Sequence, residues 1–147
     1  MPIQNCKIDP SCKIIYPDLV NLYGCTIGEN TQVGPFVEIQ KDVKIGRNCK
    51  ISSHTFICSG VTIGDNCFIG HGVVFINDRN PRAINEKGEL ASENDWKLEE
   101  TFVEDNVSIG SSSTIMCGIK IGKNSLIGAR TFVLKDIKSG EKFFNKL

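Results

Sequence analysis

The side chains best suited to proton transfer near neutral pH are the two histidines of the chain, His54 and His71. An imidazole changes charge near neutrality, so it can accept a proton from one group and return it to another. His54 follows two serines and His71 lies between Gly70 and Gly72, so both histidines are predicted to lie in turns. A catalytic zinc site of the three-histidine type needs one more histidine, and we expect no metal. The alternative is that each histidine caps a turn and contacts solvent or a neighbouring subunit.

The balance of charge argues against several classes of partner. The 17 basic and 17 acidic residues leave no net charge, so we expect no nucleic acid as a partner. No apolar run is long enough to span a bilayer and the N-terminus does not resemble a secretion signal, so we expect a cytoplasmic protein that does not bind membranes. The seven cysteines form no CxxC pair, which favours a reducing compartment. Cys12, Cys49 and Cys67 are predicted to face inward as small apolar side chains.

An aliphatic or aromatic residue recurs every six positions, and this repeat predicts the elements that position the histidines. The repeated positions are Ile27, Val33, Ile39, Ile45, Ile51, Ile57, Ile63, Ile69, Phe75, Val103, Ile109, Ile115, Ile121, Ile127 and Val133. Residues four places later are small or β-branched. Each unit of six residues is therefore expected to form a short strand and a turn, with two side chains facing inward. One unit cannot bury its own apolar side, so the units must stack around a narrow core.

Asparagines recur every eighteen residues at Asn30, Asn48 and Asn66, and this second period predicts three strands per coil. Asparagine tolerates positive φ, and its amide can bond to the same amide one coil above. We therefore expect a column of asparagines at one corner. Asn66 and Asn106 are forty residues apart, which is one coil plus an insertion of about twenty-two residues.

These periods predict one β-helix domain over residues 1–147, with an irregular N-terminal coil at 1–26, an inserted loop at 76–102 and a short tail at 139–147. A loop of this length inside a compact domain is usually functional or disordered. Trp96, the single tryptophan of the chain, favours a loop that is anchored and functional. In the tail, Phe143 and Phe144 are candidates to cover the last coil.

Stacking coils of eighteen residues aligns the turns in three columns, about 4.8 Å per step. The first column holds the asparagines. The second column holds His54, Gly72, Ser112 and Arg130, beside Ser53, His71, Ser111 and Ala129. The third column holds Ser59, Asn77, Cys117 and Lys135, beside Gly60, Asp78, Gly118 and Asp136. Both histidines are thus predicted to lie at one corner on neighbouring coils.

The repeat aliphatic-Gly-x-x-small-x, over roughly residues 8 to 138, resembles that of the hexapeptide-repeat acyltransferases. This resemblance implies an all-β fold, a single-stranded left-handed parallel β-helix with three strands per coil and one long inserted loop. More specific segments resemble nucleotide-sugar N-acetyltransferases that act on dTDP-3-amino-3,6-dideoxyhexoses and UDP-linked 3-amino sugars. These segments are Ile51-Ser-Ser-His-Thr-Phe-Ile57, Gly70-His-Gly-Val-Val-Phe-Ile-Asn-Asp78, Pro81-Arg-Ala83 and Asp95-Trp-Lys97.

The resemblance implies an acetyl-CoA-dependent N-acetyltransferase that modifies the amine of a nucleotide-linked amino sugar, for lipopolysaccharide or another cell-surface polysaccharide. It also implies a homotrimer with sites between subunits. We expect His54 to be the catalytic base, or else to orient the sugar. The expected substrate-binding residues are Asn77, Asp78, Arg82 and His71. The expected residues for coenzyme A are small turn residues and cations, namely Gly110, Ser111, Gly128, Ala129, Arg130 and Lys135.

Two other functions remain open from the sequence. A sugar O-acetyltransferase would use the same fold and cofactor but transfer the acetyl group to a hydroxyl. A non-catalytic β-helix could serve as a scaffold, although the histidine column and the inserted loop argue against it.

Overall fold

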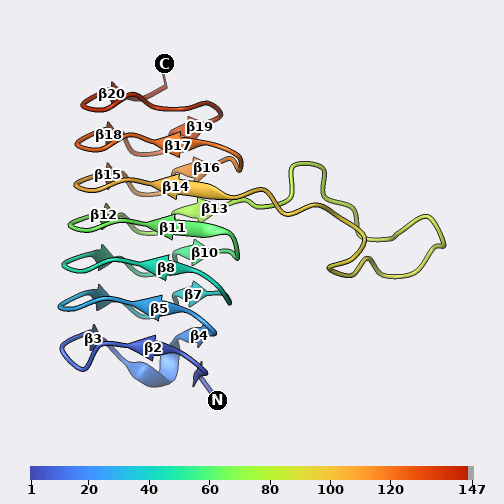
Figure 1. Cartoon of the computed structure of the whole chain (residues 1–147), viewed down its shortest axis with the longest axis horizontal. Helices are drawn as coiled ribbons and strands as arrows, with labels where there is room; N and C mark the ends of the chain where they lie inside the picture. Colours follow the sequence, from blue (N-terminus) through green and yellow to red (C-terminus); the bar gives the residue numbers. More distant parts are fainter. Residues whose placement is uncertain (146–147) are drawn as a thin grey trace.

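The computed structural model describes residues 1–145 and consists of short parallel strands wound into coils (Figure 1). The first strands, up to the regular repeat, are β1 Ile3–Gln4, β2 Lys7–Ile8, β3 Lys13–Ile14 and β4 Asn21–Tyr23, with the 3-10 turn η1 Pro17–Leu19 before β4. The next are β5 Thr26–Ile27, β6 Gln32–Val33, β7 Glu38–Ile39, β8 Lys44–Ile45, β9 Lys50–Ile51, β10 Phe56–Ile57, β11 Val61–Ile63, β12 Phe68–Ile69 and β13 Val74–Phe75. The last are β14 Thr101–Val103, β15 Ser108–Ile109, β16 Thr114–Ile115, β17 Lys120–Ile121, β18 Leu126–Ile127, β19 Phe132–Val133 and β20 Lys142–Phe143.

Every third strand joins the same parallel sheet, so the chain forms a three-sided prism. Sheet A has the order β1-β4-β7-β10-β13-β16-β19, sheet B the order β17-β14-β11-β8-β5-β2, and sheet C the order β20-β18-β15-β12-β9-β6-β3. In Figure 1 the strands of sheet B run leftward in front and the chain returns rightward behind them as it rises to the C-terminus. The coil is therefore a left-handed β-helix, as expected from the resemblance.

The core is the column of repeated aliphatic side chains inside the prism. Ile51, Ile69 and Ile109 face each other in register on successive coils of sheet C, and each is at most 2% exposed. Cys49 and Cys67 are buried in the small inward column, as predicted. Cys12 also points inward, where its thiol donates to Gly28 O over 2.9 Å, but it is only partly buried because it lies in the first coil.

The first corner holds the asparagine column, at Asn30, Asn48, Asn66, Asn106 and Asn124, and all five have φ between 57° and 62°. Within residues 1–145 no hydrogen bond joins one asparagine amide to the next, so the expected amide ladder is wrong. Main-chain bonds connect the column instead. Asn48 N donates to Glu29 O over 2.8 Å and Asn66 N to Arg47 O over 2.9 Å, because stacking in register places each N–H above a carbonyl of the preceding coil.

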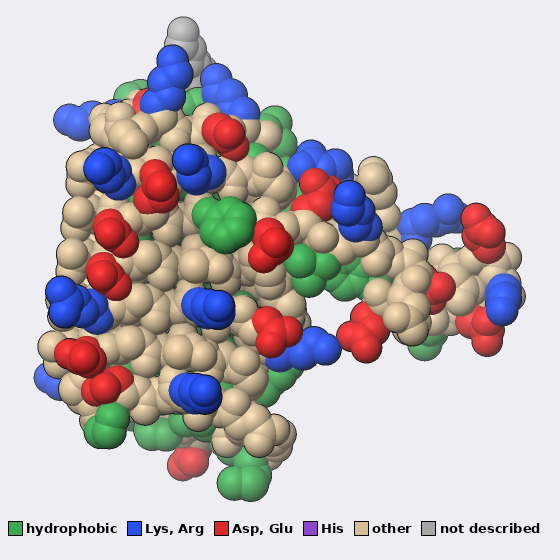
Figure 2. Space-filling view, viewed as in Figure 1, with side chains coloured by type: hydrophobic (Ala, Val, Ile, Leu, Met, Phe, Trp, Pro, Cys, Tyr) green, Lys and Arg blue, Asp and Glu red, His purple; other side chains and the backbone are tan. Residues whose placement is uncertain are grey.

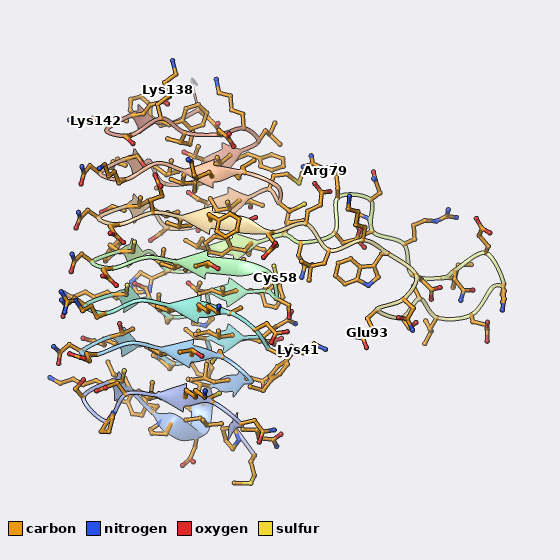
Figure 3. All side chains as sticks on the ribbon, in the orientation of Figure 1. Lys41, Cys58, Arg79, Glu93, Lys138 and Lys142 are labelled. Carbon is orange, nitrogen blue, oxygen red and sulfur yellow. The ribbon has the colours of Figure 1, made fainter. Side chains whose placement is uncertain are left out.

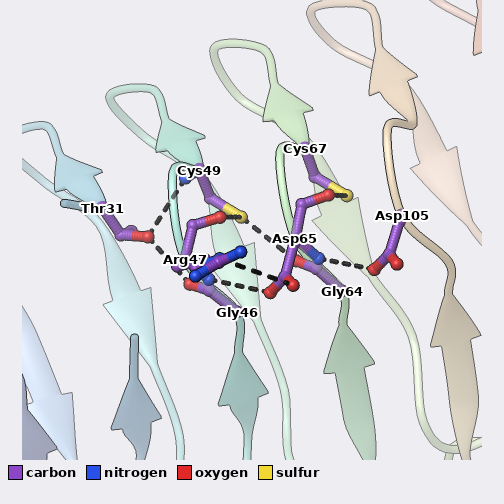
Figure 4. Close-up of polar contacts among 8 residues, drawn as sticks. All are labelled: Thr31, Gly46, Arg47, Cys49, Gly64, Asp65, Cys67 and Asp105. Carbon is purple, nitrogen blue, oxygen red and sulfur yellow. Dashed lines mark hydrogen bonds and ion pairs between the residues drawn. The ribbon is translucent and has the colours of Figure 1, made fainter. Parts of the chain in front are cut away.

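Acidic side chains add a second set of bonds at this corner (Figure 4). The Asp65 carboxylate accepts from Arg47 N over 3.0 Å, and the Asp105 carboxylate accepts from Asp65 N over 2.7 Å. These N–H groups lie where the chain turns between strands, so a carboxylate from the next coil supplies the acceptor that a strand would. The first corner is therefore held by structural contacts rather than open to a ligand.

The ends of the chain are more regular than the sequence predicts. Within residues 1–26, strands β1 to β4 pair in register with the next coil, and the irregular part is η1. In the tail, β20 pairs with β18 and Phe143 packs against the core, whereas Phe144 is 62% exposed. Phe143 alone therefore covers the last coil, because alternate side chains of a strand point to opposite faces.

The chain leaves the prism after β13 and returns at β14, and the segment between them, residues 76–100, projects from the third corner (Figure 1). The strand resumes at Thr101, two residues before the expected end of the loop, because Thr101 is buried and its N–H donates to Gly60 O over 3.0 Å. We call residues 76–100 the insertion. Figure 2 shows it standing away from a body on which acidic and basic side chains are mixed. Within residues 1–145 no helix is long and apolar enough to cross a membrane.

Candidate active site

The second corner joins sheet C to sheet A and carries both histidines. His54, Gly72, Ser112 and Arg130 have φ of 63°, 63°, 62° and 54°, so the chain makes the same left-handed turn on four successive coils. The N–H of each later residue bonds to the coil below, as Gly72 N does to Ser53 O over 2.9 Å. The corner is therefore a column of side chains spaced about 4.8 Å apart, which is the spacing predicted from the sequence.

A notch opens in this column at Gly72. A methyl group built on Gly72 would have one neighbour within 4 Å, Ser112 Oγ at 3.9 Å. His54 occupies the equivalent position one coil below and Ser112 the position one coil above. The gap left by Gly72 is therefore one coil high and borders both histidines, which gives a reacting group room to approach them.

His71 is held from both sides. Its Nδ1 lies 2.9 Å from Ser53 Oγ on the coil below, and its backbone N–H donates to Ser111 Oγ over 3.1 Å on the coil above. Its carbonyl accepts from Ser112 N over 2.8 Å. The ring is exposed to solvent, yet both its direction and its backbone are determined by neighbouring serines.

His54 has a different environment. Its ring lies against Phe36, with centroids 5.0 Å apart and planes tilted by 37°. Within residues 1–145 neither ring nitrogen of His54 has a hydrogen-bond partner. Phe36 packs against the ring from the coil below, but no hydrogen bond within residues 1–145 fixes the rotation of the imidazole ring.

The residues expected to bind coenzyme A separate into two places. Gly110, Ser111, Gly128, Ala129 and Arg130 lie at the second corner above the histidines, whereas Lys135 lies at the third corner. Lys135 Nζ is 5.6 Å from the centre of the Phe143 ring, over the end of the prism. Arg130 is exposed and makes no ion pair with any residue in 1–145, so it is available to an anionic ligand.

Packing between neighbouring coils explains why positions 110 and 128 are glycines. A methyl group on Gly110 would collide with the backbone of Gly128 and Ala129 on the next coil. A methyl group on Gly128 would meet Phe144 Cβ at 2.8 Å. The close approach that requires glycine here is that of the neighbouring coil, so a cofactor is not needed to explain it.

The expected substrate residues Asn77, Asp78 and Arg82 lie at the third corner and in the insertion. Asp78 and Arg82 line a hollow of about 460 Å³, together with Asn80 and Trp96 among others. Sheet A separates this corner from the histidines by five to six extended residues, roughly 15–20 Å. One chain therefore does not bring its histidines and its insertion to the same small substrate.

The root of the insertion is fixed to the prism by several contacts. Arg79 Nε and Nη2 lie 3.0 and 3.2 Å from the two carboxylate oxygens of Glu99, and Nη2 also donates to Cys117 O over 2.8 Å (Figure 3). Asn77 Nδ2 donates to Ser59 O over 2.9 Å. Hydrogen bonding to Arg79 lowers the pKa of the Glu99 carboxyl. Farther out, Lys41 and Glu93 form an exposed ion pair of 3.2 Å between the body and the insertion.

Family comparisons match the repeat directly. Residues 24–59 and 100–135 match the family described as bacterial transferase hexapeptide (six repeats), and residues 60–76 match the hexapeptide repeat of succinyl-transferase. Together these segments span more than half of the chain. The chain belongs to the hexapeptide-repeat transferase family. The gap in the match covers the insertion, as the interrupted repeat predicted.

Curated hexapeptide-repeat relatives include two bifunctional GlmU proteins. That of Thermodesulfovibrio yellowstonii is 31% identical over 149 residues, which cover 91% of this chain and 32% of the relative. That of Carboxydothermus hydrogenoformans is 32% identical with the same coverage. The chain spans about a third of the length of these relatives.

Solved structures with the same fold include two complexes that contain coenzyme A or an acyl-CoA together with a nucleotide or a nucleotide sugar. AntD, an N-acyltransferase from Bacillus cereus in complex with dTDP and 3-hydroxybutyryl-CoA, has a TM-score of 0.66 and 21% identity, over 92% of this chain and 72% of its own. PerB from Caulobacter crescentus, in complex with CoA and GDP-perosamine, has a TM-score of 0.60 and 17% identity, over 92% and 48%. At these identities the likeness establishes the fold.

Sequence reasoning missed three features of the site of this hexapeptide-repeat protein. Phe36 supports His54, and a signal existed, because it lies eighteen residues before His54. Ser53 was placed beside the histidines, but its contact with His71 depends on a side-chain rotamer that spacing does not give. The ion pair between Arg79 and Glu99 joins the two ends of an insertion whose path has no period.

Proposed function

We propose that this chain transfers an acetyl group from acetyl-CoA to the amine of a nucleotide-linked amino sugar, at the notch beside His54 and His71. The observation that carries the proposal is the placement of both histidines, from neighbouring coils, around the space left by Gly72. The ligands named for AntD and PerB, coenzyme A or acyl-CoA with a nucleotide or nucleotide sugar, support the choice of reactants.

The chemistry requires one proton acceptor and a place for negative charge. The neutral amine attacks the thioester carbonyl, the carbon–sulfur bond breaks, and the amine nitrogen loses a proton while the thiolate gains one. A histidine at the notch accepts the first proton and returns it to the sulfur. Arg130, exposed two coils above Gly72, suits a phosphate of coenzyme A because it has no ion-pair partner within residues 1–145.

The proposed site lies between subunits of a homotrimer. The third corner of one subunit supplies Asn77, Asp78 and Arg82, and the second corner of another supplies the histidines, since one chain holds these groups roughly 15–20 Å apart. Sheet A, between the two corners, exposes Val74 by 38% and Phe132 by 43%. Sheet C exposes Phe68 and Leu126 to a similar degree, by 42% and 43%, so sheets A and C both offer apolar side chains for a second copy to cover.

The compartment and pathway follow from the reactants. Acetyl-CoA and seven unpaired cysteines both suit the cytoplasm, where thiols stay reduced. An N-acetylated nucleotide sugar is a precursor for a glycosyl transfer, and we place this enzyme in the synthesis of a cell-surface polysaccharide such as lipopolysaccharide.

The test is thiol release from acetyl-CoA with dTDP- and UDP-linked 3-amino and 4-amino sugars. We expect release with one amine, and loss of release in the double variant His54→Ala/His71→Ala. Lys44→Ala, on the outer face of sheet B, is the matched control and should behave as wild type. Release with a sugar that carries a hydroxyl in place of the amine would contradict N-transfer, and no release with any sugar would contradict the enzyme.

A mixing experiment tests the site between subunits. His54→Ala/His71→Ala and Asp78→Ala are each expected to be inactive alone, because each removes one half of every site. Subunits co-expressed in equal amounts should recover about a quarter of the sites, since each site then draws its two halves at random. Light scattering should give the mass of three chains. Absence of recovery in a trimer would place both halves of the site on one chain.

A further inference from the structure

We propose that His71, rather than His54, is the proton acceptor, and that Ser53 is the positioning residue that fixes the His71 ring. The proposal rests on the proposed function for its catalytic part, while the ring geometry can be tested without any substrate. It reverses the assignment expected from the sequence, in which His54 is the base and His71 binds the substrate.

Serines on the coil below and the coil above contact His71. Ser53 Oγ is 2.9 Å from Nδ1, which is a short hydrogen bond for an exposed pair. The Ser111 hydroxyl accepts from the His71 N–H over 3.1 Å, and Ser112 N donates to the His71 carbonyl over 2.8 Å. Backbone and ring are thus both held by groups that the parallel register places one coil away. No hydrogen bond within residues 1–145 holds the His54 ring, which packs against Phe36 with the two ring planes tilted by 37°.

The Ser53 hydroxyl can donate to Nδ1 or accept from Nδ1–H, and the proposal takes the second arrangement. When Nδ1–H donates to Ser53 Oγ, the neutral ring carries its lone pair on Nε2. Nε2 has no hydrogen-bond partner within residues 1–145, so this lone pair is open to a ligand, and we place that ligand beside the neighbouring Gly72. In the reaction Nε2 accepts the proton that the attacking amine loses, the ring becomes imidazolium, and Nε2 then gives the proton to the departing thiolate. Atoms and charge balance with no further reactant.

His54 then has a different role. His54 lies one coil below Gly72 and its ring packs against Phe36. We assign it a part in shaping the notch. A side chain that shapes the notch affects how well the amine is bound, whereas the proton acceptor affects the rate of the bond-forming step. Substitutions at the two histidines should therefore separate into an effect on KM for His54 and an effect on kcat for His71.

The first experiment measures the ring tautomer directly. Long-range proton–nitrogen NMR spectra of protein carrying ¹⁵N-histidine, assigned by His54→Ala and His71→Ala, distinguish Nδ1–H from Nε2–H. We expect wild-type His71 to be the Nδ1–H form, Ser53→Ala to give a mixture, and Ser53→Thr to restore the wild-type form because threonine keeps the hydroxyl. Ser52→Ala, the same change one residue earlier in the coil, is the matched control and should leave the spectrum unchanged. An Nε2–H tautomer in the wild type, or a Ser53→Ala spectrum identical to wild type, would overturn the assignment.

The second experiment measures kcat and KM with the amino sugar that gives thiol release in the panel of nucleotide-linked sugars. Ser53→Ala should lower kcat about tenfold with little change in KM, the size expected for loss of a group that orients a reacting side chain. Ser53→Thr should recover most of kcat, and Ser52→Ala should match the wild type. Unchanged kcat in His71→Ala would reject His71 as the proton acceptor and leave the proposed function intact. No release by the wild type would reject both roles in catalysis, while the spectra would still decide whether Ser53 fixes the ring.

Discussion

The same substitution to alanine should cost much more stability at Gly70 than at Gly72, two glycines of one turn. Gly70 precedes His71 and lies directly against the next coil, where a methyl group would be 2.6 Å from Ser111 N and 2.9 Å from Ser111 Cα. The Ser111 backbone is held on both sides, since Gly70 N donates to Ile109 O over 2.8 Å and Arg130 N of the coil above donates to Ser111 O over 2.9 Å. Gly70→Ala must therefore push two coils apart.

The expected costs can be worked from these contacts. Overpacking against backbone costs up to about 3 kcal/mol, and Gly70→Ala should reach that value because no flexible side chain can yield. Gly72→Ala meets no atom closer than 3.9 Å, so its cost is that of a left-handed residue, about 1 kcal/mol. Gly72→Asn should cost less than Gly72→Ala, because five asparagines of the first corner adopt the same positive φ.

Urea unfolding followed by circular dichroism measures all three free energies on one scale, and thiol release measures activity. Gly70→Ala should unfold at much lower urea than Gly72→Ala. Gly72→Asn should be folded like the wild type yet inactive, since its side chain fills the notch. Equal stabilities for Gly70→Ala and Gly72→Ala would refute the coil-contact reasoning, and a fully active Gly72→Asn would refute the notch.

Three further predictions concern stability, the insertion and the cysteines. Ile69→Ala, at a fully buried core position, should lower the free energy of unfolding by about 3–4 kcal/mol. Ile84 lies in the insertion and is 48% exposed, so Ile84→Ala should change the free energy of unfolding by less than about 0.5 kcal/mol. Urea unfolding measures both values. Because hydrogen bonding to Arg79 lowers the pKa of Glu99, their ion pair is complete above the ordinary carboxyl range and is lost as pH falls below that range through the lowered pKa. Fluorescence of Trp96, the single tryptophan, should change in that window, and the same change in Glu99→Gln would disprove the link to this pair. Burial, together with the neighbouring Cys6 thiol, raises the pKa of Cys25 to about 12. Cys25 should therefore react with a thiol reagent at about pH 8 far more slowly in the folded protein than in urea. Mass spectrometry of the labelled peptides measures the two rates, and equal rates would contradict the burial of Cys25.

The fold was predictable because its period is in the sequence. A spacing of six residues defines which side chains face inward, and a spacing of eighteen defines which lie above one another, so the column containing His54, Gly72 and Arg130 could be written down before any coordinates. Handedness could not, because a left-handed coil has the same period as a right-handed one and was inferred from resemblance. The asparagine ladder failed for a related reason: the period places the residues but does not say whether backbone or side chain supplies the bond.

The contacts of the candidate site were less predictable because they depend on side-chain rotamers and on non-periodic segments. Ser53 and Pro35 occupy equivalent positions on successive coils, yet Ser53 alone can hold a histidine ring. The period already places Lys135 and Arg130 at different corners, but it does not show that the Lys135 side chain lies over the Phe143 ring. Charge and residue type identify candidates, and the register decides which of them can meet.

The insertion shows how a coil can gain a binding element without losing its register. Its two ends meet at the same corner of one coil, where Glu99 N donates to Asn77 O over 3.1 Å, so a main-chain hydrogen bond closes the excursion. Phe68 still pairs with Ser108 and Ile69 with Ile109 across the interruption. A corner therefore accepts a long segment at the cost of loop closure, which grows slowly with length. Because such a segment projects from one corner while the histidines lie at another, a site that uses both favours assembly of several chains over folding of one.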